Sequence, residues 1–238
     1  MQTPVAATPT AGTPDDADAS PARSIVLCAV PGAGETQVSD LLRRCGAGDV
    51  HPYFDLDRVA PALLAEWEID HLDQYIAALH RHRSTTDGVF GLLLRWHDIR
   101  RLLARVMGPR QSTPRRVLDV IEVIAPEPTF VRLRRTERAQ HVLALRAWQE
   151  RSTRSGDDQR PPPPTDPERL TALVDATEAV WTQWFDAVGI APVEVVYEEL
   201  IDDPAAQDAL VARLGLTPPS GADGGPAPMP VAGDAAGA

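Results

Sequence analysis

The segment between Ser24 and Cys45 constrains the fold of this chain most strongly. Residues 24–30 form a continuous apolar run, which is typical of a strand buried on both faces of a parallel sheet. The turn Pro31-Gly-Ala-Gly-Glu-Thr36 follows at once, and apolar residues then repeat at helical spacing. Such a turn directs backbone N–H groups and the positive end of the helix dipole toward one point. The segment therefore predicts an anion-binding turn; the alternative is a plain tight connection between strand and helix.

The rest of the chain repeats this alternation of strand and helix. Short apolar runs predict three more strands, at 88–94, 129–133 and 193–196. Helical patterns lie between and after these runs, over 59–67, 69–79, 97–107, 115–124, 136–152, 170–188 and 205–214. Strands that alternate with helices predict an α/β fold with a central parallel sheet, helices on both faces, and ligands at the carboxyl ends of the strands.

Proline-rich ends flank the expected domain. Proline makes up 23 of the 238 residues, about twice its ~5% average usage. Residues 1–22 and 217–238 contain almost no large apolar side chains, so we expect them to be disordered tails around one domain at 23–216. The proline cluster at 154–168 lies between two helical patterns and predicts an exposed, partly polyproline loop.

Charge and hydropathy exclude several classes of partner. The net charge of −11 argues against binding nucleic acid or an anionic membrane surface, because both partners require a positive face. No apolar stretch approaches the about 18 residues of a membrane span, and the N-terminus lacks a secretion pattern, so we expect a cytoplasmic protein. Cys28 and Cys45 are too few for a zinc site or a disulfide framework, and we expect no metal.

All 23 basic residues are arginines, so the chain has no lysine. Against the nucleotide-binding pattern G-x-x-x-x-G-K-[ST], residues 29–36 have Ala29 for the first glycine and Glu35 for the lysine. A carboxylate at the lysine position repels phosphate. A degenerate P-loop kinase is therefore the least favoured class of function.

Five segments together resemble the bacterial trehalose-type sulfotransferases, which move a sulfuryl group from 3′-phosphoadenosine 5′-phosphosulfate (PAPS) to a sugar hydroxyl. Residues 32–42 fit the family's first loop at Gly34, Thr36 and Asp40 but not at Gly32 and Glu35. The family's N-G-V-[WF]-G-x-K-x-x-W strand resembles residues 87–96, with Leu93 in place of lysine, and its R-x-D-x-x-x-Q-x-x-S-x-x-R-A-x-Q segment resembles residues 134–149, with Leu143 in place of serine. Its W-x-x-W-F and Y-E-x-L elements resemble residues 181–185 and 197–200.

This resemblance implies a P-loop-like three-layer α/β sandwich and a set of donor contacts. The 5′-phosphosulfate would be held by the loop residues Gly32, Ala33, Gly34, Glu35 and Thr36. The 3′-phosphate would pair with Arg134, with Arg135 as the alternative, because a guanidinium donates two parallel hydrogen bonds to phosphate. The hydroxyl expected beside that arginine is replaced by Leu143, which donates nothing.

Asp40 lies where the family places its proposed catalytic base. Thr36 and Asp40 are four residues apart on one helix face, so the Asp40 carboxylate is predicted to face the loop. The alternative is an aspartate that only stabilises the helix dipole. Glu35 is either a carboxylate in the anion site or an N-terminal helix residue that points to solvent.

Two hypotheses of function follow. The first is a PAPS-dependent sulfotransferase that acts on a hydroxyl of a small sugar-like or secondary-metabolite acceptor, without a metal. The second is a non-catalytic descendant of the same fold that acts as a binding or scaffold protein, because Gly32, Glu35 and Leu143 replace expected donor contacts. The resemblance suggests a homodimer for either.

Overall fold

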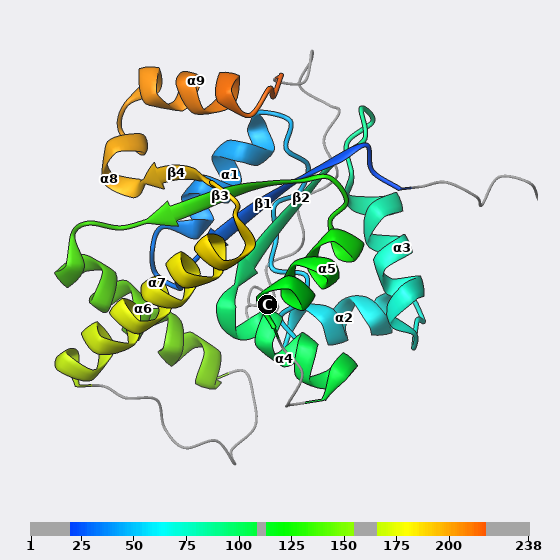
Figure 1. The fold of residues 1–238 in the computed structure, drawn as a ribbon, viewed down its shortest axis with the longest axis horizontal. Helices are drawn as coiled ribbons and strands as arrows, with labels where there is room; N and C mark the ends of the chain where they lie inside the picture. The colour runs from blue at the N-terminus through cyan, green and yellow to red at the C-terminus, as the bar shows by residue number, and fades with distance from the viewer. Residues whose placement is uncertain (1–19, 109–112, 155–165, 218–238) are drawn as a thin grey trace, which may run out of the picture.

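A four-stranded parallel sheet forms the centre of the molecule (Figure 1). The computed structural model describes residues 20–108, 113–154 and 166–217. The sheet order is β2-β1-β3-β4, and the strands are β1 (Arg23–Ala29), β2 (Val89–Arg95), β3 (Pro128–Arg134) and β4 (Val193–Val196). The four predicted strands are confirmed to within a residue at each end, because β1 and β2 are buried along nearly their whole length and leave an uninterrupted apolar signal in the sequence.

Helices cover both faces of the sheet and complete the predicted three-layer α/β architecture (Figure 1). One face packs against α1 (Glu35–Arg44), α8 (Tyr197–Leu200) and α9 (Pro204–Arg213). The other face packs against α2 (Val59–Glu66), α3 (Leu72–Arg83), α4 (Trp96–Met107), α5 (Pro114–Ile124), α6 (Arg138–Arg154) and α7 (Pro167–Val188). The sheet therefore separates two apolar cores.

The long helix α7 ends at Val188, as the sequence indicates, and begins at Pro167, three residues before the predicted start. The Asp166 side chain accepts a hydrogen bond from the Arg169 N–H, and Pro167 occupies the first turn. Gly189 ends the helix in the left-handed conformation, which glycine adopts without steric cost. Trp181, Trp184 and Phe185 of this helix are buried in the core, so the tryptophans act as packing residues.

The described residues test the predicted boundaries only in part. The Ala22 N–H donates to the Gly88 carbonyl at 2.8 Å, so packing starts within the segment predicted as a tail. Residues 1–19, 218–238 and most of the proline cluster at 154–168 lie outside the described residues. Within the described ranges, none of the helices combines the length and the apolar character that crossing a membrane requires.

Candidate functional site

The turn that is predicted to bind an anion lies at the carboxyl edge of the sheet, as its place after β1 requires. Ala29, the last residue of β1, is in register with Arg95 of β2 on one side and with Leu133 of β3 on the other. The segments that leave these three strands therefore start at the same level. Gly32 and Gly34 both have positive φ, 85° and 95°, and the turn leads directly into α1.

The Glu35 carboxylate lies inside this turn. Its Oε2 accepts a hydrogen bond from the Gly32 N–H at 3.0 Å, and its Oε1 lies 3.4 Å from the same nitrogen. Only 6% of the residue is exposed, so the hypothesis that Glu35 points to solvent is wrong. The carboxylate lies beside the N-terminus of α1, where the helix dipole favours negative charge.

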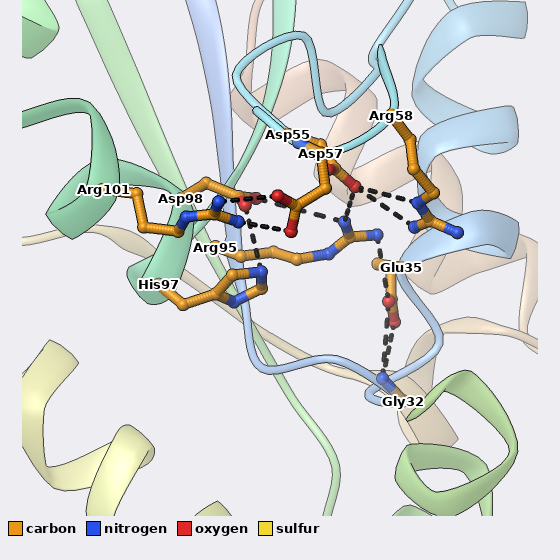
Figure 2. A network of polar contacts seen from close by, with 9 residues as sticks. All are labelled: Gly32, Glu35, Asp55, Asp57, Arg58, Arg95, His97, Asp98 and Arg101. Atoms are coloured by element: carbon orange, nitrogen blue, oxygen red, sulfur yellow. Dashed lines mark hydrogen bonds and ion pairs between the residues drawn. The ribbon is translucent and has the colours of Figure 1, made fainter. Parts of the chain in front are cut away.

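Arg95 supplies the nearest cation to this carboxylate (Figure 2). Its Nη2 lies 3.6 Å from Oε1 of Glu35, while its Nη1 lies 3.9 Å from Asp55 and 4.0 Å from Asp98. The guanidinium carbon also lies 5.4 Å from the centre of the Trp148 ring. Arg95 is 6% exposed and stands at the centre of the network that Figure 2 shows.

The two aspartates beside Arg95 have partners of their own. Asp55 accepts hydrogen bonds from the Arg58 side chain, the shorter at 3.1 Å, and from the backbone N–H of Asp57. Asp98, which is buried, contacts Nε2 of His97 at 3.0 Å. His97 is partly exposed, and its ring lies beside that of Trp148. These contacts fix a charged cluster next to the turn.

Of the two arginines proposed for the 3′-phosphate, Arg135 is the one beside the turn. Its Nη1 donates to the Gly32 carbonyl at 3.3 Å, and its guanidinium lies over the Tyr197 ring. Arg134 is half exposed and lies 3.5 Å from Glu178 of α7 instead. The structure therefore brings Arg135 and the turn together and leaves Arg134 on the opposite side of its strand.

Thr36 and Asp40 lie on α1, as the sequence predicts. Thr36 is exposed, and Asp40 is half exposed, with its Oδ1 accepting a hydrogen bond from Arg43 at 3.1 Å. Leu143 is 59% exposed on α6. Among the described residues, no group of three or more histidine, cysteine, aspartate or glutamate side chains is arranged to hold a metal ion.

A model of the Stf0 sulphotransferase family matches residues 24–234. The chain belongs to this family. A search of curated proteins found no match to the chain. The family match covers β1, the turn and every strand of the sheet, so the resemblance drawn from the five segments is confirmed.

Two neighbouring residues of α8, Tyr197 and Glu198, support the turn and the start of α6. A Cβ at Gly34 would lie 2.1 Å from the Tyr197 ring, so this ring packs directly against the loop. Glu198 accepts hydrogen bonds from the Thr136 and Glu137 N–H groups and the Thr136 hydroxyl, each at 3.0 Å. Burial alone would raise the pKa of Glu198, but these hydrogen bonds outweigh it and lower the pKa to about 2. Glu198 is therefore an ionised support for the start of α6.

His141 of α6 contacts the turn at Pro31. It is fully buried on α6, and its Nε2 lies 3.2 Å from the Pro31 carbonyl oxygen. Burial lowers the pKa of His141 to about 4, against the opposing effect of the Pro31 contact. The imidazole is neutral near pH 7 and positions the loop through a hydrogen bond. His97, by contrast, is partly exposed beside the site.

Sequence reasoning missed Arg95 as a site residue, although a signal was present. Arg95 is the single charge that ends the apolar run of β2. A charge at the carboxyl end of a buried parallel strand lies at the edge where ligands bind. Its approach to Glu35 depends on the register between β1 and β2, which no local pattern encodes.

Proposed function

We propose that the protein transfers a sulfuryl group from PAPS to a hydroxyl of a sugar-like or other small-metabolite acceptor. One observation carries the proposal: the loop already holds an anion. The Glu35 carboxylate accepts the Gly32 N–H beside the buried Arg95 guanidinium. A loop that stabilises a carboxylate has the donors and the positive potential that a phosphosulfate group requires.

In this proposal, the backbone from Gly32 to Thr36 and the Thr36 hydroxyl bind the 5′-phosphosulfate, and Arg135 binds the 3′-phosphate in preference to Arg134. Asp40 takes the proton of the acceptor hydroxyl while that oxygen attacks sulfur in line. The bond between sulfur and the phosphate oxygen breaks, and 3′-phosphoadenosine 5′-phosphate (PAP) leaves with the electron pair. Arg43 contacts one Asp40 oxygen and leaves the other for the acceptor.

A non-catalytic binding protein is the second candidate, and the same carboxylate favours it. Glu35 competes with the donor for the Gly32 N–H, and each charge-assisted hydrogen bond that the donor loses removes roughly 1.5–3 kcal/mol. Restoring an arginine at position 32 is not possible without rearrangement. A Cβ there would lie 2.6 Å from the Leu145 backbone nitrogen.

Calorimetry with PAP tests the enzymatic proposal on the unmodified protein. We expect binding in the range of micromolar to millimolar affinity; no heat of binding at millimolar PAP would exclude PAPS as the donor. Glu35→Ser separates the two candidates, because it removes the competing carboxylate without a steric change at Gly32. If Glu35→Ser binds PAP more tightly than the unmodified protein, the result supports an enzyme whose donor site is partly occupied by Glu35. If neither protein binds PAP, the non-catalytic protein is supported. Glu66→Ser, an exposed glutamate on α2, is the matched control.

A further inference from the structure

In the described part of the chain, the start of α1 has no side-chain cap. Gly34 is the N-cap residue, and among the described residues no side chain accepts a hydrogen bond from the first turn. The Glu35 carboxylate instead reaches back to Gly32, outside the helix. The N-terminal N–H groups of this 10-residue helix therefore stay available to an oxyanion.

Arg95 is the second, independent sign of a ligand at this place. Its Nε and Nη1 atoms are buried and make no hydrogen bond within the described part of the chain. The distance of 3.6 Å between Nη2 of Arg95 and Oε1 of Glu35 is too long for the hydrogen bonds that normally satisfy a guanidinium. Asp55 and Asp98 lie farther from it, at 3.9 and 4.0 Å. Asp55 is engaged by Arg58, and Asp98 contacts His97 through Oδ1, while its Oδ2 makes no hydrogen bond within the described residues. Arg95 therefore lacks an anion that fits it.

We propose that Arg95 is the cation of an oxyanion site at this loop and that the Glu35 carboxylate is an internal occupant, which an incoming sulfate or phosphate group displaces. The inference deepens the proposed function, since it names the residues that would meet the donor's sulfuryl and phosphoryl oxygens. In place of a basic side chain within the loop itself, the positive charge comes from the end of the neighbouring strand, β2.

The shape of the two anions explains why exchange is favourable. The Glu35 carboxylate is planar and tethered to α1, so it bonds Gly32 at 3.0 Å but stays 3.6 Å from Arg95. A tetrahedral oxyanion has three or four oxygens directed in different ways. It accepts the Gly32 N–H through one oxygen and a guanidinium N–H of Arg95 through another. Figure 2 shows the Arg95 guanidinium and Gly32 on opposite sides of the Glu35 carboxylate.

Binding of inorganic pyrophosphate and sulfate to the full chain tests the site without a nucleotide. At fixed ionic strength, with chloride as the reference anion, we expect Glu35→Ser to bind pyrophosphate at least about tenfold more tightly than the unmodified protein, as removal of one competing charged group implies. Adding Arg95→Gln should abolish this gain. Glu35→Ser combined with Arg101→Gln should keep it, because Arg101 pairs with Asp57 on the far side of the network.

The Arg95→Lys variant and a parallel measurement of PAP binding complete the test. Arg95→Lys retains the charge, so in the Glu35→Ser background it should keep part of the gain even if Arg95→Gln fails to fold by circular dichroism. Equal pyrophosphate affinity of Glu35→Ser and the unmodified protein, or an undiminished gain with Arg95→Gln, overturns the inference. Pyrophosphate binding without PAP binding supports the oxyanion site and rejects the PAPS proposal. PAP binding with the same affinity in the presence and absence of Arg95→Gln supports the PAPS proposal and rejects the oxyanion site at Arg95.

Discussion

Gly32 lies against the backbone of α6 in the turn after β1. Its φ of 85° is in the region that favours glycine, and a Cβ would lie 2.6 Å from the Leu145 nitrogen and 3.0 Å from the Ala144 carbonyl carbon. Neither contact is with a flexible side chain, so α6 itself would have to move. The glycine thus fixes how closely α6 packs on the loop, and with it the position of the N–H that holds Glu35.

Gly32→Ala should therefore destabilise the protein by about 2–3 kcal/mol, the sum expected from left-handed strain and a backbone clash. Gly189→Ala is the matched control, because Gly189 has φ of 70° but nothing within 4 Å of its Cβ position. The control should cost only about 1 kcal/mol. Urea unfolding of both variants checks this, and equal losses would mean that α6 accommodates a Cβ at Gly32.

Asp40 is the residue on which the proposed chemistry depends. Asp40→Asn keeps the size of the side chain and removes the base, so kcat for sulfuryl transfer should fall by about 10²–10⁴-fold with little change in the KM for PAPS. Release of PAP in the presence of trehalose or glucose is a suitable readout. Asp186→Asn, an exposed aspartate on α7, should leave the rate unchanged. A normal rate in Asp40→Asn would move the role of base to another group, and His97 beside Asp98 is the one to examine next.

At the scale of elements, the strands were predictable and the contacts between them were not. The buried strands β1 and β2 are continuous apolar runs, and β3 and β4 are short and mostly apolar, so all four were found from the sequence. Helix α8 was not, because four residues are too short to show a helical period. The turn after β1 was located from glycines and order alone. The approach of Arg95 to Glu35, and of Tyr197 to Gly34, follows from register and packing across β1, β2 and β4, which a sequence pattern does not contain.

Helix α6 is joined to the loop through His141, and this contact should make stability depend on pH. The pKa of His141 is lowered from 6.5 to about 4 in the folded protein. Between these values the unfolded chain binds the proton and the folded chain does not, so stability falls as pH is lowered from 6.5 toward 4. The contribution of this site is at most about 3 kcal/mol.

His141→Gln should flatten that dependence. We expect the loss in free energy of unfolding between pH 7 and pH 5, measured by urea titration, to be smaller in the variant by about 1–2 kcal/mol. Glu198 does not interfere, because its pKa of about 2 places its own loss of stability at lower pH. Identical slopes in the two proteins would show that His141 is not buried as a neutral imidazole.

At the scale of the whole molecule, the first strand is hydrogen-bonded to the last described segment of the chain. The Arg23 guanidinium donates to the carbonyls of Leu214 and Gly215 at 2.8 and 2.6 Å. Leu214 and Leu216 are buried in the core between the sheet, α1 and α9. The family match continues to residue 234, past the predicted domain end at 216. Whether residues after Thr217 add to the stability of the domain is therefore open to a direct test.

Two shortened chains provide that test. A chain that ends at Thr217 keeps both leucines and the Arg23 contacts, so its free energy of unfolding should equal that of the full chain within about 0.5 kcal/mol. A chain that ends at Arg213 loses both leucines, and since each buried leucine is worth roughly 2–5 kcal/mol, it should lose at least about 4 kcal/mol. Thermal and urea unfolding of the three proteins measure the differences. A marked loss in the chain that ends at Thr217 would place part of residues 218–234 in the folded domain and move its boundary beyond the predicted one.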